Sequence, residues 1–273
     1  MERLEKALQK ARRQRAHLEG QPHLVPVGGP GGAAVSVNTA DVTYTETRRM
    51  RVSERILDKW RIVARRTRRS EADIFRMLRT KVVQQMTHAG MNTLAVSSPR
   101  YGEGKTTIAI NLALSLAMDV NHTVLLVDLD LRKPSLHTRL GLTPDIGIND
   151  YLLHGEPIQS CLVHPGFERI VVLPASRQLD RSSEILAAPK MVALVEELKT
   201  RYPDRMVIYD MPPLLTQDDT IAFLPNVDGV LLVVKEGETR REDLRRAVHL
   251  LGDSLMGTVV NHSTEHNFHE STR

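Results

Sequence analysis

Residues 98–107, with the sequence SPRYGEGKTT, combine glycines, a lysine and two threonines in an order suited to binding phosphate. Glycines let backbone N–H groups turn toward phosphate oxygens, Lys105 can neutralise the charge of the outer phosphates, and the Thr106 hydroxyl can ligate Mg²⁺. The usual motif, G-x-x-x-x-G-K-[S/T], begins with a glycine where this chain has Pro99, but the later positions keep their spacing. The phosphates of ATP are therefore predicted to bind to Gly102, Glu103, Gly104, Lys105, Thr106 and Thr107.

The flanks of this loop support that interpretation over a chance glycine-rich turn. An apolar run at residues 93–96 precedes it, and a helix-like stretch at residues 108–118 follows it. A phosphate-binding loop requires this strand, loop and helix order, because the positive end of the helix must face the anion.

Three aspartates follow apolar, strand-like runs, which places them at strand ends. Asp128 and Asp130 follow the run at residues 124–127, and Asp210 follows the run at residues 206–209. Mg²⁺ prefers oxygen ligands and keeps several waters, so a hydroxyl and one or two carboxylates beside the phosphates suffice. One of Asp128 and Asp130 could instead accept the proton of an incoming hydroxyl, and the sequence does not tell the two apart. The alternative for each aspartate is a helix N-cap. The predicted metal ligands are Thr106, Asp128, Asp130 and Asp210.

From residue 92 onward, short apolar runs alternate with longer helical patterns. This alternation predicts an α/β fold, a doubly wound and mostly parallel sheet of the P-loop NTPase type, with ligands at the carboxyl ends of the strands. The predicted strands are residues 93–97, 123–128, 169–173, 206–210, 229–234 and 257–260. The predicted helices are residues 106–118, 132–140, 183–199, 216–223 and 239–251, preceded by a helical stretch at 53–86.

A length of 273 residues allows one α/β domain and an extension. We expect an amphipathic basic helix at residues 1–20, a flexible Gly- and Pro-rich linker at 21–52, the nucleotide-binding domain at 53–262 and a disordered tail at 263–273.

Positive charge is concentrated between residues 48 and 81, which contain thirteen arginines and lysines but only four acidic residues. Such a block suits an anionic lipid surface, an acidic partner or nucleic acid, or it is a solvated helix with a structural role, and charge alone does not choose. Cys161 is the single cysteine, which excludes a disulfide within the chain, and no apolar signal segment opens the sequence. These features predict a cytoplasmic protein.

Three motifs together resemble the bacterial tyrosine kinases, or BY-kinases, of capsule and exopolysaccharide synthesis. They are S-S-P-x-x-G-E-G-K-T-T at residues 97–107, D-x-D-x-R-x-P at 128–134 and D-x-P-P at 210–213, which that family calls Walker A, A′ and B. The resemblance implies ATP and Mg²⁺ as cofactors and adenine recognition by Asn261. It also implies a catalytic set composed of Lys105, Asp128, Asp130 and Arg132.

The same resemblance implies partners. Asp73, Arg76 and Arg79 are similar to an E-x-x-R-x-x-R helix used for self-association, with Asp in place of Glu, so a homo-oligomer is expected. A chain-length-determinant membrane protein, the polysaccharide co-polymerase, is the expected activator. It would hold the chain at the inner face of the cell membrane, and nucleic acid is a disfavoured partner.

The tail departs from the family, because residues 261–273 contain no tyrosine for neighbouring subunits to phosphorylate. Of the five tyrosines in the chain, Tyr44 in the expected linker is the most accessible candidate. The leading hypothesis is an autokinase that regulates polysaccharide synthesis and export. A regulatory ATPase or scaffold without tyrosine transfer is the alternative. A partition-type ATPase ranks last, because those proteins usually have lysine at the position of Arg100 and lack the D-x-D-x-R-x-P element.

Overall fold

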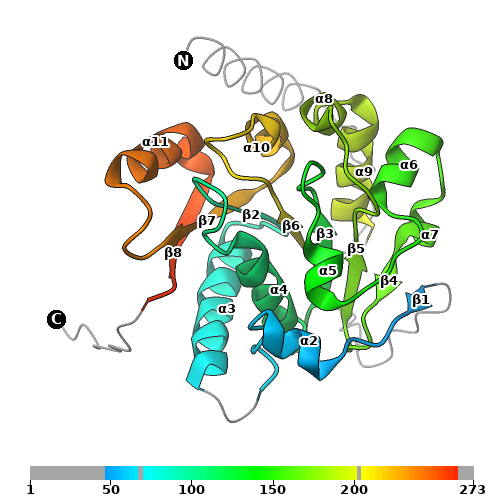
Figure 1. Cartoon of the computed structure of the whole chain (residues 1–273), viewed down its shortest axis with the longest axis horizontal. Coiled ribbons are helices and arrows are strands. Elements are labelled where there is room, and N and C mark those ends of the chain that lie inside the picture. Colours follow the sequence, from blue (N-terminus) through cyan, green and yellow to red (C-terminus); the bar gives the residue numbers. More distant parts are fainter. Residues whose placement is uncertain (1–46, 67–69, 202–203, 264–273) are drawn as a thin grey trace, which may run out of the picture.

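The computed structural model describes residues 47–66, 70–201 and 204–263 of the chain (Figure 1). The predicted helix at residues 1–20, most of the predicted linker and tail, and Tyr44 lie outside the described residues.

A single mixed sheet forms the centre of the described structure (Figure 1). Its neighbouring strands are parallel, except that β4 and β5 pair antiparallel. The order across the sheet is β1 (Arg48–Arg49), β4 (Val163–His164), β5 (Ile170–Leu173), β3 (Thr123–Asp128), β6 (Arg205–Asp210), β2 (Thr93–Ser97), β7 (Gly229–Lys235) and β8 (Leu255–Asn261). The strand that follows β2 in sequence is β3, and β6 lies between the two in the sheet. This strand order is the doubly wound arrangement expected from the sequence.

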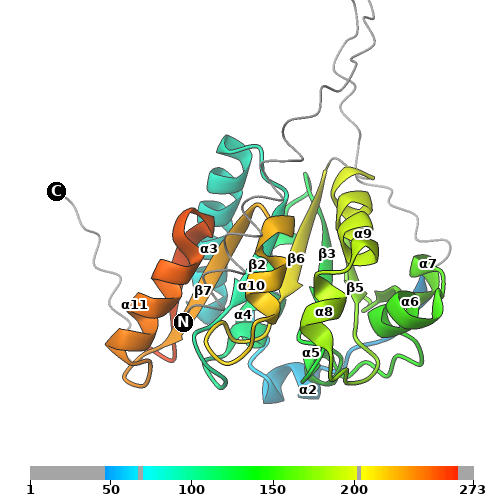
Figure 2. The ribbon, with the colours of Figure 1, turned by 90° about the horizontal axis from the view of Figure 1, so that it is seen from above.

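Helices cover both faces of this sheet (Figure 2). Along β3, Leu125 and Val127 belong to one buried cluster, whereas Val124 and Leu126 belong to the other, because side chains alternate between the faces of a strand. One cluster includes residues of α2 (Glu54–Lys59), α3 (Ser70–His88), α4 (Lys105–Leu116) and α5 (Leu136–Leu140). The other includes residues of α6 (Ile148–His154), α7 (Ile158–Cys161), α8 (Ser182–Leu186), α9 (Pro189–Thr200), α10 (Asp219–Phe223) and α11 (Arg241–Leu251). Short 3₁₀ turns η2 (Leu224–Asn226) and η3 (Gly252–Ser254) complete the described elements. The predicted fold class is confirmed.

Several predicted helix boundaries were wrong. The stretch at residues 53–86 is two helices, α2 and α3, and Arg61 between them has a positive φ of 55°. The stretch at 183–199 is also two helices, because Pro189 disfavours helical backbone at the residue before it. The helices predicted to begin at residues 132 and 216 begin at Leu136 and Asp219.

The end of the predicted linker is part of the sheet, because Arg48–Arg49 forms β1 and pairs with β4. The short elements β1, β4, α6 and α7 were not predicted from sequence. They span two to seven residues each, too few for a periodic pattern to register.

Asn111, buried on α4, bonds the N-terminal segment to the helix that follows the phosphate loop. Its Oδ1 accepts the backbone N–H groups of Val63 (2.7 Å) and Ala64 (2.9 Å). Its Nδ2 donates to the carbonyls of Arg61 (3.0 Å) and Thr107 (2.9 Å). One side chain therefore satisfies two donors and two acceptors that lie between α2 and α3 and at the start of α4.

Replacing Asn111 with alanine should lower the free energy of unfolding by about 3 kcal/mol, because it leaves buried N–H groups without acceptors. Urea denaturation followed by far-UV circular dichroism measures the change. Asn121→Ala is the control, since Asn121 is exposed and bonds within its own turn to Asp119. A loss no larger for Asn111→Ala than for this control would contradict the role assigned to Asn111.

Candidate active site

The phosphate loop lies between β2 and α4, and its two glycines adopt backbone conformations that other residues rarely take. Gly102 has φ +84° and Gly104 has φ +92°. A Cβ atom on Gly104 would lie 2.1 Å from Nδ2 of Asn261, so a side chain there would displace Asn261 from the loop. Gly104 also provides no side-chain cap for α4, which leaves the first N–H groups of that helix for an anion.

Side chains of the loop hold its shape. The buried Glu103 carboxylate accepts the Arg100 N–H (2.9 Å) and the Thr239 hydroxyl (2.6 Å). Arg100 forms two hydrogen bonds with Asp243 of α11, from Nε (2.6 Å) and Nη2 (2.9 Å). That contact lowers the pKa of Asp243. Glu103, predicted from sequence to bind the nucleotide, thus directs its carboxylate to groups of the protein.

Lys105 is buried between a carboxylate from the segment after β3 and one from the end of β6. Its Nζ lies 2.8 Å from Oδ2 of Asp130 and 3.7 Å from Oδ1 of Asp210. Burial alone would lower the pKa of Lys105, but the charges of Asp210 and Asp130 outweigh it and raise the pKa above the ordinary value. The lysine therefore stays charged inside the protein.

Asp128 is bound differently from Asp130. Its Oδ2 accepts the backbone N–H groups of Ser135 (3.2 Å) and Leu136 (3.0 Å), and its Oδ1 accepts the N–H of Asp130 (3.3 Å). Burial raises the pKa of Asp128, and the nearby charge of Asp210 raises it further. The carboxylate thereby fixes the start of α5, which explains why that helix begins later than predicted.

Asp210 accepts the fewest hydrogen bonds of the three acids. It is fully buried, and neither carboxylate oxygen accepts a hydrogen bond that meets normal geometry within the described residues, although the Thr106 side chain lies next to it. Burial raises the pKa of Asp210, although Lys105 opposes the shift. A buried acceptor of this kind calls for a cation or a donor.

These residues fit a magnesium–triphosphate group. Three buried carboxylates surround one lysine, so negative charge is in excess. The Thr106 hydroxyl lies 3.4 Å from Nζ of Lys105 and 3.4 Å from the Ser135 hydroxyl, which adds a neutral oxygen beside the acids. No set of three or more His, Cys, Asp or Glu side chains forms a ready metal cage in the described part of the chain. Mg²⁺ does not need one, since it binds through one or two carboxylates, waters and phosphates.

Arg139, on α5, was missed from sequence. Its Nη1 donates to the Thr107 hydroxyl (2.9 Å), and its guanidinium lies 4.6 Å from the centre of the Trp60 ring. Burial lowers the pKa of Arg139, whereas the charges of Asp210 and Asp128 raise it. Arg139 thus adds a positive charge near the acids and bonds to the start of α4. No motif in the sequence predicts this role.

Asp128, Asp130 and Asp210 form an acidic cluster around Lys105. Two predicted site residues make their contacts outside this cluster. Arg132 donates from Nε to the Ser182 hydroxyl (2.8 Å) and lies 3.5 Å from Asp219. Asn261 lies at the phosphate loop, where its Nδ2 donates to the Glu103 carbonyl (2.9 Å) and its Oδ1 accepts the N–H of His262 (2.9 Å). Adenine recognition by Asn261 stays a prediction.

The residues predicted for self-association interact within the chain. Arg76 pairs with Asp73 one turn away, and Arg79 donates to the carbonyl of Ser115 on α4 (3.1 Å). Ile74 and Met77 on the same helix are 45% and 48% exposed, so α3 also presents apolar surface. The oligomer stays a prediction.

A family model described as an AAA domain matches residues 91–250. The tyrosine-protein kinase YwqD of Bacillus subtilis strain 168 is 32% identical over 191 residues, which cover 68% of this chain and 79% of YwqD. The succinoglycan biosynthesis transport protein ExoP of Rhizobium meliloti is 30% identical over 207 residues, which cover 74% of this chain and 26% of ExoP. The VpsO kinase domain superposes with a TM-score of 0.60 at 28% identity, covering 70% of this chain and 97% of that domain.

None of the helices in the described residues is long and apolar enough to span a membrane.

Replacing Asp210 with asparagine should stabilise the nucleotide-free protein at neutral pH by about 1–2 kcal/mol, because it removes excess buried charge. It should also abolish the added stability that Mg·ATP gives to the wild type. Between the ordinary aspartate pKa of 3.8 and the raised pKa of Asp210, the folded chain binds more protons than the unfolded chain. Wild-type stability therefore falls as pH rises through that window, and the advantage of the variant grows.

Thermal unfolding from pH 4 to 8, with and without Mg·ATP, measures both effects. Asp228→Asn is the matched control, because burial of Asp228 is outweighed by bonds from Lys199 and Thr93 that lower its pKa. That variant should be less stable than the wild type at neutral pH. A destabilised Asp210→Asn protein that still gains stability from Mg·ATP would contradict the assignment.

Proposed function

The chain belongs to the bacterial tyrosine kinase family, and on that premise we propose that it transfers the γ-phosphoryl group of ATP to tyrosine hydroxyls. The observation that carries the proposal is the convergence of Lys105, Asp130 and Asp210 beside an uncapped helix start. Phosphoryl transfer depends on positioning and charge neutralisation more than on covalent chemistry, and these groups supply both.

In the proposed mechanism, the loop N–H groups and Lys105 bind the phosphates. Thr106 and the acidic cluster would hold Mg²⁺, which when bound neutralises charge on the phosphates. One of Asp128 and Asp130 accepts the proton that the attacking tyrosine hydroxyl loses. The buried position of these groups keeps bulk water from competing with that hydroxyl.

The proposed role is regulation of exopolysaccharide or capsule synthesis and export, together with a membrane protein that controls chain length. The names of YwqD and ExoP support it, since one is a tyrosine-protein kinase and the other a succinoglycan biosynthesis transport protein. We place the chain in the cytoplasm, at the inner face of the membrane, through that partner. Self-association would use α3.

The second candidate function is a regulatory ATPase without tyrosine transfer, because the same lysine and acids beside an uncapped helix start also suit ATP hydrolysis. Among the tyrosines of the described residues, Tyr209 is buried and Tyr151 is half-buried, whereas Tyr101 is 38% exposed. In the leading proposal the acceptor is therefore Tyr101, a tyrosine outside the described residues (Tyr44 or Tyr202), or a tyrosine of another protein.

Purified protein incubated with ATP and Mg²⁺ should yield phosphotyrosine, and Lys105→Met should reduce the rate by about 100-fold or more, because the variant loses the charge that faces the phosphates. Mass-spectrometric mapping of phosphorylated residues and a phosphate-release assay measure transfer and hydrolysis separately. Lys190→Met is the control, since Lys190 contacts the backbone of α6 at an exposed site. Release of phosphate without any phosphotyrosine would select the regulatory ATPase.

Deleting residues 1–47 should leave Mg·ATP binding unchanged within about twofold, because β1 and the Asn111 contacts are retained. We propose that these N-terminal residues bind the membrane partner, so the same deletion should release the protein from the membrane fraction of cells that contain it. Nucleotide titration and membrane sedimentation measure the two effects. A truncated chain that still sediments with membranes would contradict N-terminal docking.

A further inference from the structure

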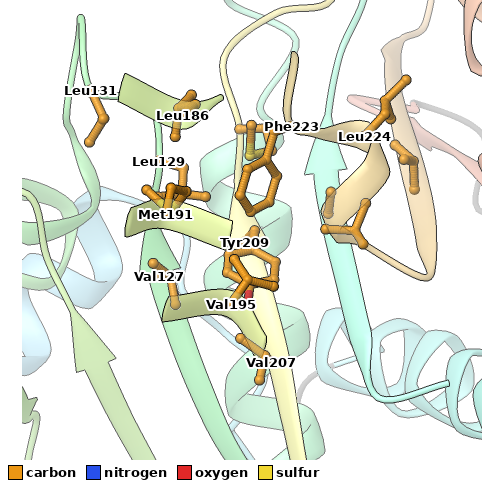
Figure 3. Packing of buried hydrophobic residues seen from close by; sticks show 14 of the residues in the cluster. Val127, Leu129, Leu131, Leu186, Met191, Val195, Val207, Tyr209, Phe223 and Leu224 are labelled. Carbon is orange, nitrogen blue, oxygen red and sulfur yellow. The ribbon is translucent and has the colours of Figure 1, made fainter. Parts of the chain in front are cut away.

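The segment after β3 alternates between the core and the acidic cluster. Leu129 and Leu131 are fully buried and share one apolar cluster with Leu186 of α8 and Phe223 of α10 (Figure 3). The residue between the two leucines, Asp130, contacts Lys105. The core packing thus fixes the turn on which Arg132 lies and holds it against α8 and α10.

The guanidinium of Arg132 bridges the starts of those two helices. Its Nε donates to the hydroxyl of Ser182, the first residue of α8, at 2.8 Å. The same nitrogen lies 3.5 Å from a carboxylate oxygen of Asp219, the first residue of α10. The Arg132 side chain is 37% exposed, so it is not sealed inside the protein by these contacts.

Asp219 differs from the acid beside it. Its side chain is completely buried, and neither oxygen accepts a hydrogen bond of normal geometry within the described residues, although the Ser182 side chain lies next to it. Asp218, 3.7 Å from Arg132, has a side chain that is 63% exposed. A buried carboxylate needs a cation, and Arg132 is the cation that the structure places against it.

The same stretch of chain also contacts the phosphate loop. Gln217, two residues before Asp219, donates from Nε2 to the hydroxyl of Tyr101, which lies within the loop. The ring of Tyr101 in turn lies 4.4 Å from Nζ of Lys133, the neighbour of Arg132. Arg132 and Asp219 are therefore next to the loop that binds phosphate.

We propose that Asp219 is a positioning residue for Arg132, holding its guanidinium at the open side of the site, where charge develops on the phosphoryl group in transfer. The inference rests on the proposed phosphoryl transfer and adds a residue to it. Arginine suits this position, because its planar donors bind phosphate oxygens in pairs and its charge is permanent. A guanidinium fixed beforehand needs no reorganisation when the charge appears.

Asp219→Asn tests the proposal, because it keeps the shape of the side chain and removes the charge that faces Arg132. We expect kcat for phosphoryl transfer to fall about tenfold, with KM for ATP changed less than about twofold and no loss of thermal stability. Asp218→Asn is the matched control and should change kcat less than about twofold, since an exposed charge is screened by water. A kcat for Asp219→Asn equal to that of this control would overturn the proposal.

A double-mutant cycle with Arg132→Ala separates positioning from a structural role. If Asp219 acts through Arg132, the double variant should be as slow as Arg132→Ala alone. If the effects of the two substitutions on kcat multiply, Asp219 does not act through Arg132. If the fall in kcat of Asp219→Asn is accompanied by a fall in melting temperature, and the double variant shows the same fall in melting temperature, Asp219 only supports the fold.

The NMR signal of the Arg132 Nε–H group decides without any catalysis. In nucleotide-free wild type and Asp218→Asn, this signal should be observable and slow in hydrogen exchange, and Arg132→Lys assigns it by its loss. In Asp219→Asn it should exchange at least tenfold faster. An unchanged exchange rate overturns the proposal. Absence of phosphotyrosine from the wild type would reject the kinase function, whereas the exchange rate and the rate of ATP hydrolysis would still test Asp219.

Discussion

The burial of the Lys105 ammonium among three carboxylates is the interaction on which the site depends. A lysine that is 7% exposed keeps its charge because Asp130 and Asp210 lie within 4 Å of it. The same acids, with Asp128, outnumber it, so the folded chain contains more negative charge here than it neutralises. A magnesium–nucleotide group would relieve this imbalance, since the acids suit its metal and the lysine and the helix start suit its phosphates.

The sheet makes this arrangement possible. Asp128 and Asp210 pair in register at the ends of the adjacent parallel strands β3 and β6, so their side chains reach the same edge. The phosphate loop leaves the next strand, β2, at the same edge. Side-chain alternation beyond β3 then sends the leucines to the core and Asp130 to Lys105. A shift of register by one residue would turn Asp130 toward the core and the two leucines toward Lys105.

Long apolar strands and the loop motif could be read from the sequence, because strands of a parallel sheet are buried on both faces and form continuous runs. The starts of α5 and α10 and the break between α2 and α3 could not, since tertiary contacts take part in deciding them. Asp128 fixes the start of α5 and Asn111 fixes the break after α2. Arg139 and Asp219 belong to no motif, and their proximity to the acids appears only once α5 and α10 are placed on the sheet. The sequence could name the acids but not separate the bonding of Asp128 from that of Asp130.

Residues near both ends of the described chain form hydrogen bonds with the phosphate loop and with α4, the helix after it. Arg100 bonds to Asp243 of α11, whereas Asn111 bonds to the segment between α2 and α3. Arg139 connects Thr107 to Trp60 of that segment. The segment between α2 and α3 is therefore bonded to Asn111 within α4, and it reaches Thr107 at the start of that helix through the Asn111 and Arg139 side chains. Polar bonds are sensitive to distance, so a displacement of this segment would strain the start of α4 without any contact in the nucleotide site.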